Sequence, residues 1–340
     1  MTPKERVLAA VRGEARDRIP VTPIFMAWGA HYVGRTYRDF YLDGDVLVEA
    51  QLAVTRAFGA DQISAISDPW RESAAYGMEF DYPPEGVGIP RGYMLKTADD
   101  VAKLGALDFE TDGRVRQRIE SVAKMAAAVG ETHSVLGWVE GPMAQYVDLR
   151  GMEAAMLDMV DSPEMFHRAA EVLVANGLEF ARRQIAAGAD TVGVGDAAAS
   201  LVGPALFREH VLPWEKRLFA GIHDAGGLIK LHICGNINDL LADLATSGAD
   251  VIDLDWMVPV ARSREAVGPD VALCGNFDPT AILLQSAPER VAEAARQCIA
   301  EGGDRFILQP GCETPPATPE ANVRAFCPCE GCLIDDALRL

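Results

Sequence analysis

The chain has 340 residues, of which 49% are hydrophobic and 24% are charged, a composition typical of a compact protein with a large buried core. The 50 acidic and 31 basic residues give a formal net charge of −19. This balance argues against a nucleic-acid partner and against an anionic membrane surface, because both would need a basic patch.

The first 20 residues predict a helix rather than a targeting segment. Thr2 and Glu5 fit a capping box, and Pro3 stands at the first helical position. No apolar run approaches the ~20 residues that a membrane span needs, so we expect a cytoplasmic protein with no membrane contact. In that setting the seven cysteines are expected to be free thiols or metal ligands rather than disulfides.

Eight short apolar runs predict β-strands, and stretches with helical periodicity, such as 162–187 and 287–301, separate them. The eight runs are 21–25, 61–66, 133–139, 190–195, 228–234, 250–255, 270–275 and 305–310. This alternation predicts an α/β protein with a single-domain (β/α)8 TIM barrel over residues 1–326, including the N-terminal helix. An open doubly wound sheet is the alternative, but no GxGxxG turn opens a helix.

Two parts of the chain fit the barrel pattern less well. The first run is interrupted by Pro23 and preceded by Pro20, which makes it the weakest strand. The cysteine-containing tail, 327–340, is expected to lie outside the barrel. Its Cys327, Cys329 and Cys332 have a C-x-C-x-x-C spacing, a weak signal for a second metal site because a fourth ligand is missing.

Polar residues follow most of the predicted strands, at the end of a barrel where active sites lie. The candidates for catalysis are Glu140, Asp196 and Asp255, and those for cofactor binding are Asn236, Asn276 and Asp278. The three carboxylates could complete a metal's ligand sphere or orient a histidine ligand. Each of the six residues could equally serve as a loop cap.

The strand at 228–234 ends in LHIC, which places a histidine and a cysteine two positions apart. Residues i and i+2 of a strand point to the same face, so His232 and Cys234 could both face the barrel mouth, with Cys312 as a third ligand from the last strand. One nitrogen and two thiolates leave a tetrahedral zinc with an open position. A substrate thiolate added there makes the centre net negative and keeps that sulfur nucleophilic, which suits thiol alkylation. The alternative is a buried histidine next to a small hydrophobic cysteine.

Several motifs resemble the uroporphyrinogen decarboxylase superfamily and, within it, the zinc-dependent methylcobamide:coenzyme M methyltransferase branch. They are KERVLAAVRGEARDRIPV near the start, EGP (140–142), LHICGN (231–236), GNFDP (275–279) and GCETPPATPEANVRAF (311–326). The resemblance extends to about residue 326. It implies that His232, Cys234 and Cys312 bind Zn²⁺, which activates a thiol to take a methyl group from a methylated corrinoid such as methylcobalamin.

The same resemblance frames the expected partners. No D-x-H-x-x-G corrinoid-binding signature occurs in the chain, so the corrinoid is expected on a separate corrinoid protein or free in solution. The other substrate is expected to be a small-molecule thiol acceptor or methyl donor, in either direction of transfer. A homodimer is compatible with the sequence.

Three other functions stay open. Corrinoid-dependent O-demethylation of methoxylated aromatics would require an aromatic-lined pocket, for which Phe25, Trp28, Tyr32 and Trp70 are available near the rim. A uroporphyrinogen decarboxylase-like lyase is disfavoured, because the segment matching the arginine-rich stretch of the decarboxylases offers only Arg35. A non-catalytic barrel with a structural zinc is the third.

Overall fold

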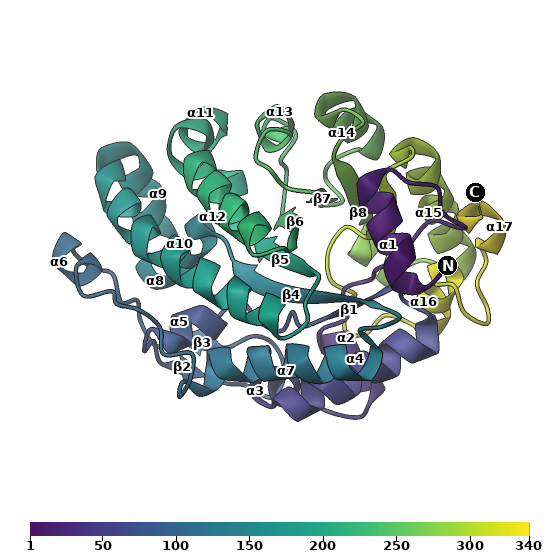
Figure 1. The fold of residues 1–340 in the computed structure, drawn as a ribbon, viewed down its shortest axis with the longest axis horizontal. Coiled ribbons are helices and arrows are strands. Elements are labelled where there is room, and N and C mark those ends of the chain that lie inside the picture. Colours follow the sequence, from purple (N-terminus) through teal and green to yellow (C-terminus); the bar gives the residue numbers. More distant parts are fainter. Residues whose placement is uncertain (340) are drawn as a thin grey trace.

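The computed structural model describes residues 1–339, and its centre is a parallel sheet that curls into a TIM-like barrel (Figure 1). The strands are β1 (Gln62–Ser64), β4 (Ser134–Glu140), β5 (Thr191–Gly195), β6 (Leu228–Ile233), β7 (Val251–Leu254), β8 (Ala272–Phe277) and β9 (Phe306–Pro310). They are hydrogen-bonded in the order β1-β4-β5-β6-β7-β8-β9. The predicted α/β class and single-domain barrel are confirmed.

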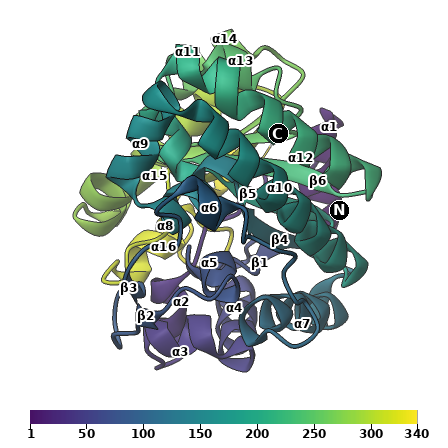
Figure 2. The same ribbon diagram turned by 90° about the vertical axis from the view of Figure 1, so that its left-hand side faces the viewer.

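Helices surround the sheet. They are α1 (Pro3–Arg12), α2 (Ala27–Tyr32), α3 (Tyr37–Leu42), α4 (Gly44–Phe58), α5 (Arg71–Ala75), α6 (Ala98–Val101), α7 (Gly113–Val129), α8 (Pro142–Arg150), α9 (Met152–Asp161), α10 (Pro163–Ala186), η1 (Ala197–Leu201), α11 (Pro204–Leu206), η2 (Phe207–Val211), α12 (Leu212–Asp224), α13 (Leu241–Leu244), α14 (Val260–Val267), η3 (Pro279–Leu284), α15 (Pro288–Gly302), α16 (Glu320–Phe326) and α17 (Asp335–Leu338). Helices α2, α3, α4 and α7 lie opposite α11, α13 and α14 in the side view (Figure 2). No helix within residues 1–339 is both long and apolar enough to cross a bilayer.

The N-terminal helix follows the sequence prediction in detail. Thr2 accepts a hydrogen bond from the backbone N–H of Glu5 at 3.2 Å, and the Glu5 carboxylate accepts one from the N–H of Thr2 at 2.8 Å. Pro3 occupies the first turn, where its missing N–H costs nothing. The two long predicted helices also form, as α10 and α15.

The first predicted strand, 21–25, is wrong: only a single parallel bridge forms, between Val21 and Leu308. Toward β9, the Thr22 N–H donates to the Leu308 carbonyl at 3.0 Å. Toward β1, the Asp61 N–H donates to the Val21 carbonyl at 2.9 Å. Pro20 and Pro23 have no N–H, so the ladder cannot extend in either direction. The segment still fills the gap between β9 and β1 and links the two edges of the sheet.

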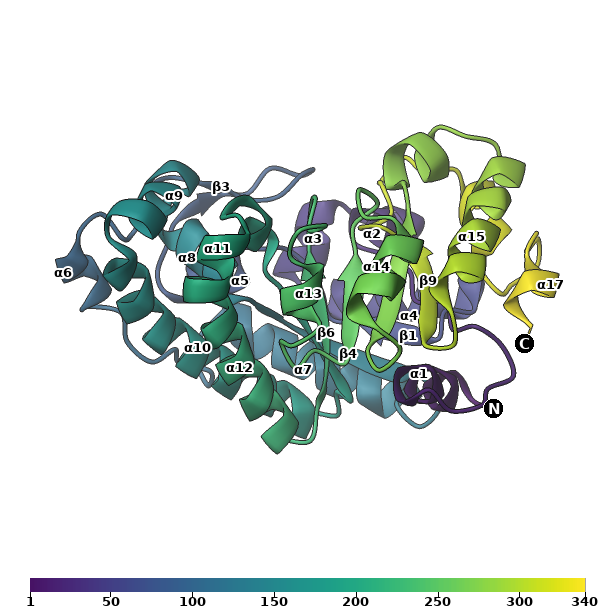
Figure 3. The same ribbon diagram turned by 90° about the horizontal axis from the view of Figure 1, so that it is seen from above.

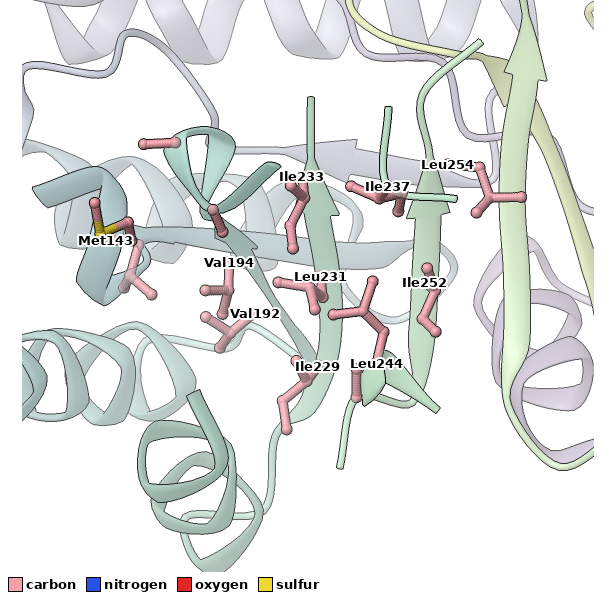
Figure 4. Close-up of a cluster of buried hydrophobic side chains, with 14 of the residues drawn as sticks. Met143, Val192, Val194, Ile229, Leu231, Ile233, Ile237, Leu244, Ile252 and Leu254 are labelled. Carbon is pink, nitrogen blue, oxygen red and sulfur yellow. The ribbon is translucent and has the colours of Figure 1, made fainter. Parts of the chain in front are cut away.

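The side chains of β6 alternate between two environments. Ile229, Leu231 and Ile233 pack in the apolar layer shared with β5, β7 and the helices (Figure 4). Lys230 and His232 point the other way, where they contact polar side chains from β7 and β9. The apolar layer fixes the register of the strand, because a one-residue slip would bury the polar set among the helices.

The two ends of the described chain lie side by side (Figure 3). The Ile19 N–H donates to the Leu338 carbonyl at 2.8 Å, and Arg18 and Arg339 form an antiparallel bridge. The tail therefore packs on the barrel through Cys327, Ile334 and Leu338, all buried, without joining the sheet. A short hairpin of β2 (Phe80–Asp81) and β3 (Ile89–Pro90), which the sequence did not predict, lies in the long loop after β1.

Candidate metal centre

His232, Cys234 and Cys312 meet at the carboxyl ends of β6 and β9. The His232 Nε2 atom lies 3.0 Å from Cys234 Sγ and 3.9 Å from Cys312 Sγ. One ligand atom from each residue lies within 4.8 Å of the other two. His232 and Cys312 are 80 residues apart, and strands β7 and β8 separate their strands in the sheet, so curvature of the barrel brings them together.

The three atoms fit a tetrahedral metal ion. Zinc–nitrogen and zinc–sulfur bonds of about 2.0 and 2.3 Å place nitrogen and sulfur roughly 3.6 Å apart at a tetrahedral angle. The two observed separations, 3.0 and 3.9 Å, bracket that value. Within residues 1–339 this is the only group of three or more histidine, cysteine or acidic side chains gathered closely enough to share an ion.

Tight packing positions the end of β9. A Cβ atom on Gly311 would lie 2.4 Å from the backbone nitrogen of Trp256, so only glycine lets the chain pass the loop after β7 there. The next residue is Cys312, whose position is fixed by this close approach. On the other ligand strand, Gly235 follows Cys234 with φ of +92°, a conformation that favours glycine and turns the chain away from the cluster.

A buried charge network lies beneath His232. Asp253 is paired in register with His232, and its Oδ2 atom lies 3.5 Å from both His232 Nδ1 and Lys230 Nζ. Gln309 joins the two charges, accepting from Lys230 at 2.7 Å and donating to the Asp253 carboxylate at 2.6 Å. Burial alone would raise the pKa of Asp253, but Lys230 and His232 outweigh it and lower that pKa. An ionised carboxylate behind a metal-binding imidazole orients the ring and raises its basicity.

Asp253 was not among the predicted site residues, although Asp255 was. The two aspartates have the same parity in the strand, so alternation could not choose between them. The register of β7 against β6, which pairs Asp253 with His232, is the signal that separates them.

The two thiols of the cluster differ in acidity. The hydrogen bond with the Cys234 thiol and the nearby His232 ring lower the pKa of Cys312 to about 4, despite its burial. The same hydrogen bond and burial raise the pKa of Cys234. One cysteine is therefore a thiolate without any metal, and thiolate is the form that binds metal ions.

The cluster lies in the wall of a cavity of about 250 Å³. The cavity is lined by Ile24, Met26, Tyr37, Ile66, Asp68, Pro69, Val87, Trp138, Glu140, Gly195, Ala197, Glu313 and the three cluster residues. A Cβ on Gly195 would come within 2.9 Å of both Trp138 and Glu140. Glycine at this point of β5 therefore leaves room for the indole and the carboxyl.

Two of the predicted catalytic carboxyls are buried near the cavity. Glu140 lines it and accepts a hydrogen bond from the Trp138 indole at 2.9 Å. Burial, with Glu72 nearby, raises the pKa of Glu140 well above its usual value. Asp196 caps the start of α8 by accepting from Ala144 N–H at 2.6 Å, and burial raises its pKa to about 7. Both groups hold a proton more readily than a free carboxylate does.

The other four predicted residues make loop hydrogen bonds and are not among the described residues that line the cavity. Asp255 accepts from the N–H groups of Gly235 and Met257, both at 2.9 Å. Asn276 donates to the carbonyl of Asp255 at 2.9 Å. Asn236 accepts from Asn238, and Asp278 caps η3 by accepting from Thr280 and Ala281. The catalytic role of Asp255 and the cofactor-binding role of the other three residues remain predictions.

The aromatic residues predicted near the rim are not among the described residues that line the cavity. Phe25 and Trp28 stack on each other, with ring centroids 5.1 Å apart, and Tyr32 stacks on Trp28. Trp70 packs against Phe80 of the hairpin. Two other rings line the cavity, Trp138 and Tyr37. The sequence did not single them out, because Trp138 lies inside a fully buried strand.

The cluster of one histidine and two cysteines, a candidate metal site, lies at the carboxyl ends of the strands of a parallel barrel, where barrel enzymes carry their active sites. The chain belongs to the uroporphyrinogen decarboxylase (URO-D) family, whose profile matches residues 2–329.

The relatives carry two kinds of name. A uroporphyrinogen decarboxylase from Nocardia farcinica is 31% identical, over 88% of this chain and 86% of its own length. The methylcobamide:CoM methyltransferase MtbA from Methanosarcina acetivorans is 24% identical, over 96% of this chain and 97% of its own. A methyltransferase structure from Methanosarcina mazei superimposes with a TM-score of 0.84 at 23% identity, over 96% of this chain and 97% of that one. These findings confirm the resemblance noted in the sequence and identify the chain as a member of a family of decarboxylases and methyltransferases.

Proposed function

We propose that the protein transfers a methyl group between a corrinoid and a small-molecule thiol or methyl donor, with Zn²⁺ held by His232, Cys234 and Cys312. The observation that carries the proposal is the meeting of these three ligand atoms within 4.8 Å in the wall of a cavity. The full-length similarity to methylcobamide:CoM methyltransferases supports the same reaction class. All seven cysteines are free, which fits a reducing cytoplasm.

When bound, zinc supplies Lewis acidity that lowers the pKa of a thiol at its open position. The chain's own residues prepare that position: Asp253 orients His232, and Cys312 is already a thiolate. In the reaction, the substrate sulfur forms a bond to the methyl carbon while the cobalt–carbon bond breaks. Both electrons of that bond stay on cobalt, and the thiol proton passes to solvent. In the reverse direction the electron pair of the reduced cobalt forms the cobalt–carbon bond. The carbon–sulfur or carbon–oxygen bond of the methyl donor breaks, and the departing sulfur or oxygen keeps that bonding pair and takes a proton from solvent.

Decarboxylation of a porphyrinogen receives less support from the site. The substrate of such an enzyme carries many carboxylates, which need cationic partners. None of the described residues that line the cavity is a lysine or an arginine. The 31% identity to a decarboxylase therefore supports the family and the fold more than this activity.

Demethylation of a methoxylated aromatic is a second candidate. Trp138 and Tyr37 line the cavity beside the cluster, and both rings can stack on an aromatic methyl donor. This reaction uses the same zinc ligands and the same corrinoid. A panel of donors and acceptors separates the two.

The corrinoid needs access to the open mouth of the barrel. Val87, at the rim of the cavity, is 41% exposed, and Trp256 and Met257 after β7 are each 47% exposed. These apolar side chains are available to a corrinoid or to the protein that carries it. A corrinoid protein is thus the partner that we propose.

The test is anaerobic incubation of the zinc-loaded protein with methylcobalamin and a series of thiols, followed by absorbance and by mass spectrometry of the methyl thioether. We expect stoichiometric demethylation of the corrinoid, lost in Cys312→Ala and retained in Glu320→Gln, a change on the exposed face of α16. Aryl methyl ethers with the reduced corrinoid form the second arm. Zinc-loaded protein that is inactive in both arms would contradict the proposal.

A further inference from the structure

The cavity beside the metal cluster combines apolar walls with acidic groups. Its polar lining, apart from Tyr37 and the cluster itself, consists of the carboxyls of Asp68, Glu140 and Glu313. The remaining lining residues are apolar or glycine. No lysine or arginine occurs among the described residues that line it.

The nearest guanidinium groups are already engaged. Arg114 binds the Asp68 carboxylate at 2.6 Å. Arg71 and Arg118, both fully buried, donate to the Ser67 hydroxyl at 2.5 and 3.0 Å. Arg114 and Arg71 face Asp68, and Arg118 lies 3.9 Å from Glu72. Moving one of these arginines toward a ligand would leave a buried carboxylate less compensated.

The lysine on the metal side is also engaged. Lys230 is buried beneath His232, between Gln309 at 2.7 Å and Asp253 at 3.5 Å. Asp253 is the ionic partner of Lys230, so this ammonium group is already paired within the barrel interior. Glu313 directly follows Cys312 and faces the cavity, and no lysine or arginine is among the described lining residues.

We infer that the small-molecule substrate carries no negative charge apart from its reacting sulfur or oxygen: the site takes a neutral or cationic thiol, or a neutral methyl donor, with a short apolar body. This rests on the proposed function. An anionic tail would lie in a low-dielectric cavity beside Glu313 and the cluster sulfurs, with no cation to pair with it. A neutral tail packs against the apolar walls, and an ammonium group meets no lysine or arginine among the described lining residues that would repel it.

Three thiols of equal length test the inference: 2-mercaptoethanol is neutral, cysteamine is cationic and 2-mercaptoethanesulfonate, which is coenzyme M, is anionic. Binding is measured by titrating each thiol into the Co²⁺-substituted protein and following the sulfur-to-cobalt absorption, corrected for the ionisation of the free thiol. A tenfold ratio of two Kd values corresponds to a difference of only about 1.4 kcal/mol in binding free energy. An unpaired charge in a low-dielectric cavity readily costs that much, so we expect the Kd of the sulfonate to be about tenfold or more above that of 2-mercaptoethanol. Cysteamine should bind at least as tightly as 2-mercaptoethanol.

A charge variant and a matched control test whether the weaker binding of the anionic thiol is due to the cavity. Glu313→Gln should narrow the ratio between the neutral and the anionic thiol severalfold. Glu320→Gln makes the same change in net charge on the exposed face of α16, where Glu320 pairs with Arg324, and should leave the ratio unchanged. Equal narrowing in both variants would overturn the role of Glu313, because it would reflect net charge alone.

The outcomes test the substrate class separately from the methyl-transfer reaction. Sulfonate binding as tight as that of 2-mercaptoethanol in the wild type overturns the substrate class, whether or not methyl transfer occurs. A clear charge preference in binding without methylation of any thiol supports the cavity's selectivity and contradicts the proposed methyl transfer.

Discussion

Buried carboxyls on the two sides of the barrel mouth have pKa values shifted in opposite directions. On the side of β6, β7 and β9, Asp253 has Lys230 and His232 as neighbours, and its pKa is lowered. On the side of β4 and β5, burial raises the pKa of Glu140, of Asp196 and of Glu215, which lies on α12 beside Asp196. All these carboxyls are buried, so burial alone does not decide their protonation.

The nearby charges decide whether a buried carboxyl is protonated. Where a cation lies within about 4 Å, a buried carboxyl stays ionised and can orient a metal ligand. Where the neighbour is another acid, burial and repulsion keep a proton on the pair. The side around Asp253 thus favours a bound cation, and the side around Glu140 and Asp196 favours protonated carboxyls.

The largest expected effect is the loss of zinc affinity when one of the three proposed ligands is removed. The wild type should bind about one zinc per chain, and Cys312→Ala should weaken that affinity by more than about 100-fold, since even loss of a group that only orients a ligand costs about 10–100-fold. Elemental analysis and competition with a chelator measure this. The matched control is Cys329→Ala in the tail, which removes a thiol outside the cluster and should keep the zinc. Zinc held equally well by Cys312→Ala would remove the basis of the ligand assignment.

A second variant tests whether the counter-charge network matters to the metal. Asp253→Asn keeps the size of the side chain but removes the charge 3.5 Å from His232 Nδ1. We expect zinc affinity to fall about 10–100-fold. Asp336→Asn, on the exposed side of α17 where Asp336 pairs with Arg296, is the control and should bind zinc as the wild type does. Unchanged affinity in Asp253→Asn would mean that the network serves the fold alone.

The smallest effect concerns the proton-holding side. The folded pKa of Asp196 is about 7, and that of Glu215 is also raised, so the folded protein holds more protons than the unfolded chain above pH ~4. Their contribution to stability is therefore full at low pH and is lost as pH rises toward 7 and beyond, by up to about 1.4 kcal/mol per pH unit for each proton.

Glu215→Gln removes one acid of the pair and lets an amide donate to Asp196. The variant should lose stability less steeply between pH 5 and 8 than the wild type, with its relative gain greatest at the alkaline end. Urea denaturation of both zinc-loaded proteins across that range measures the slopes. Parallel slopes would show that the pair is not proton-coupled to folding.

Local signals in the sequence predicted the elements well. The capping box of Thr2 and Glu5 and the apolar and helical periodicities are short-range features, and the helices and seven of the eight strands formed where they were predicted. The failure at 21–25 has a local cause as well, since two prolines remove the donors that a ladder needs. The match of H-x-C with Cys312 could be proposed because barrel topology gathers strand ends at one mouth.

Other features depended on distances that no local pattern contains. The partner of His232 is Asp253 rather than Asp255 because the register of β7 against β6 pairs the first with the histidine. The lining of the cavity by Trp138 and Glu313, and the pairing of Arg114 with Asp68, depend on which side chains from distant parts of the chain meet.

The sequence by itself determined the barrel, its helices and the chemical identity of three candidate metal ligands, because periodicity, caps and residue type act over a few residues. The tertiary structure alone decided the charge around those side chains. A carboxyl is anionic or neutral according to what lies within a few ångströms of it, and here those neighbours come from other strands.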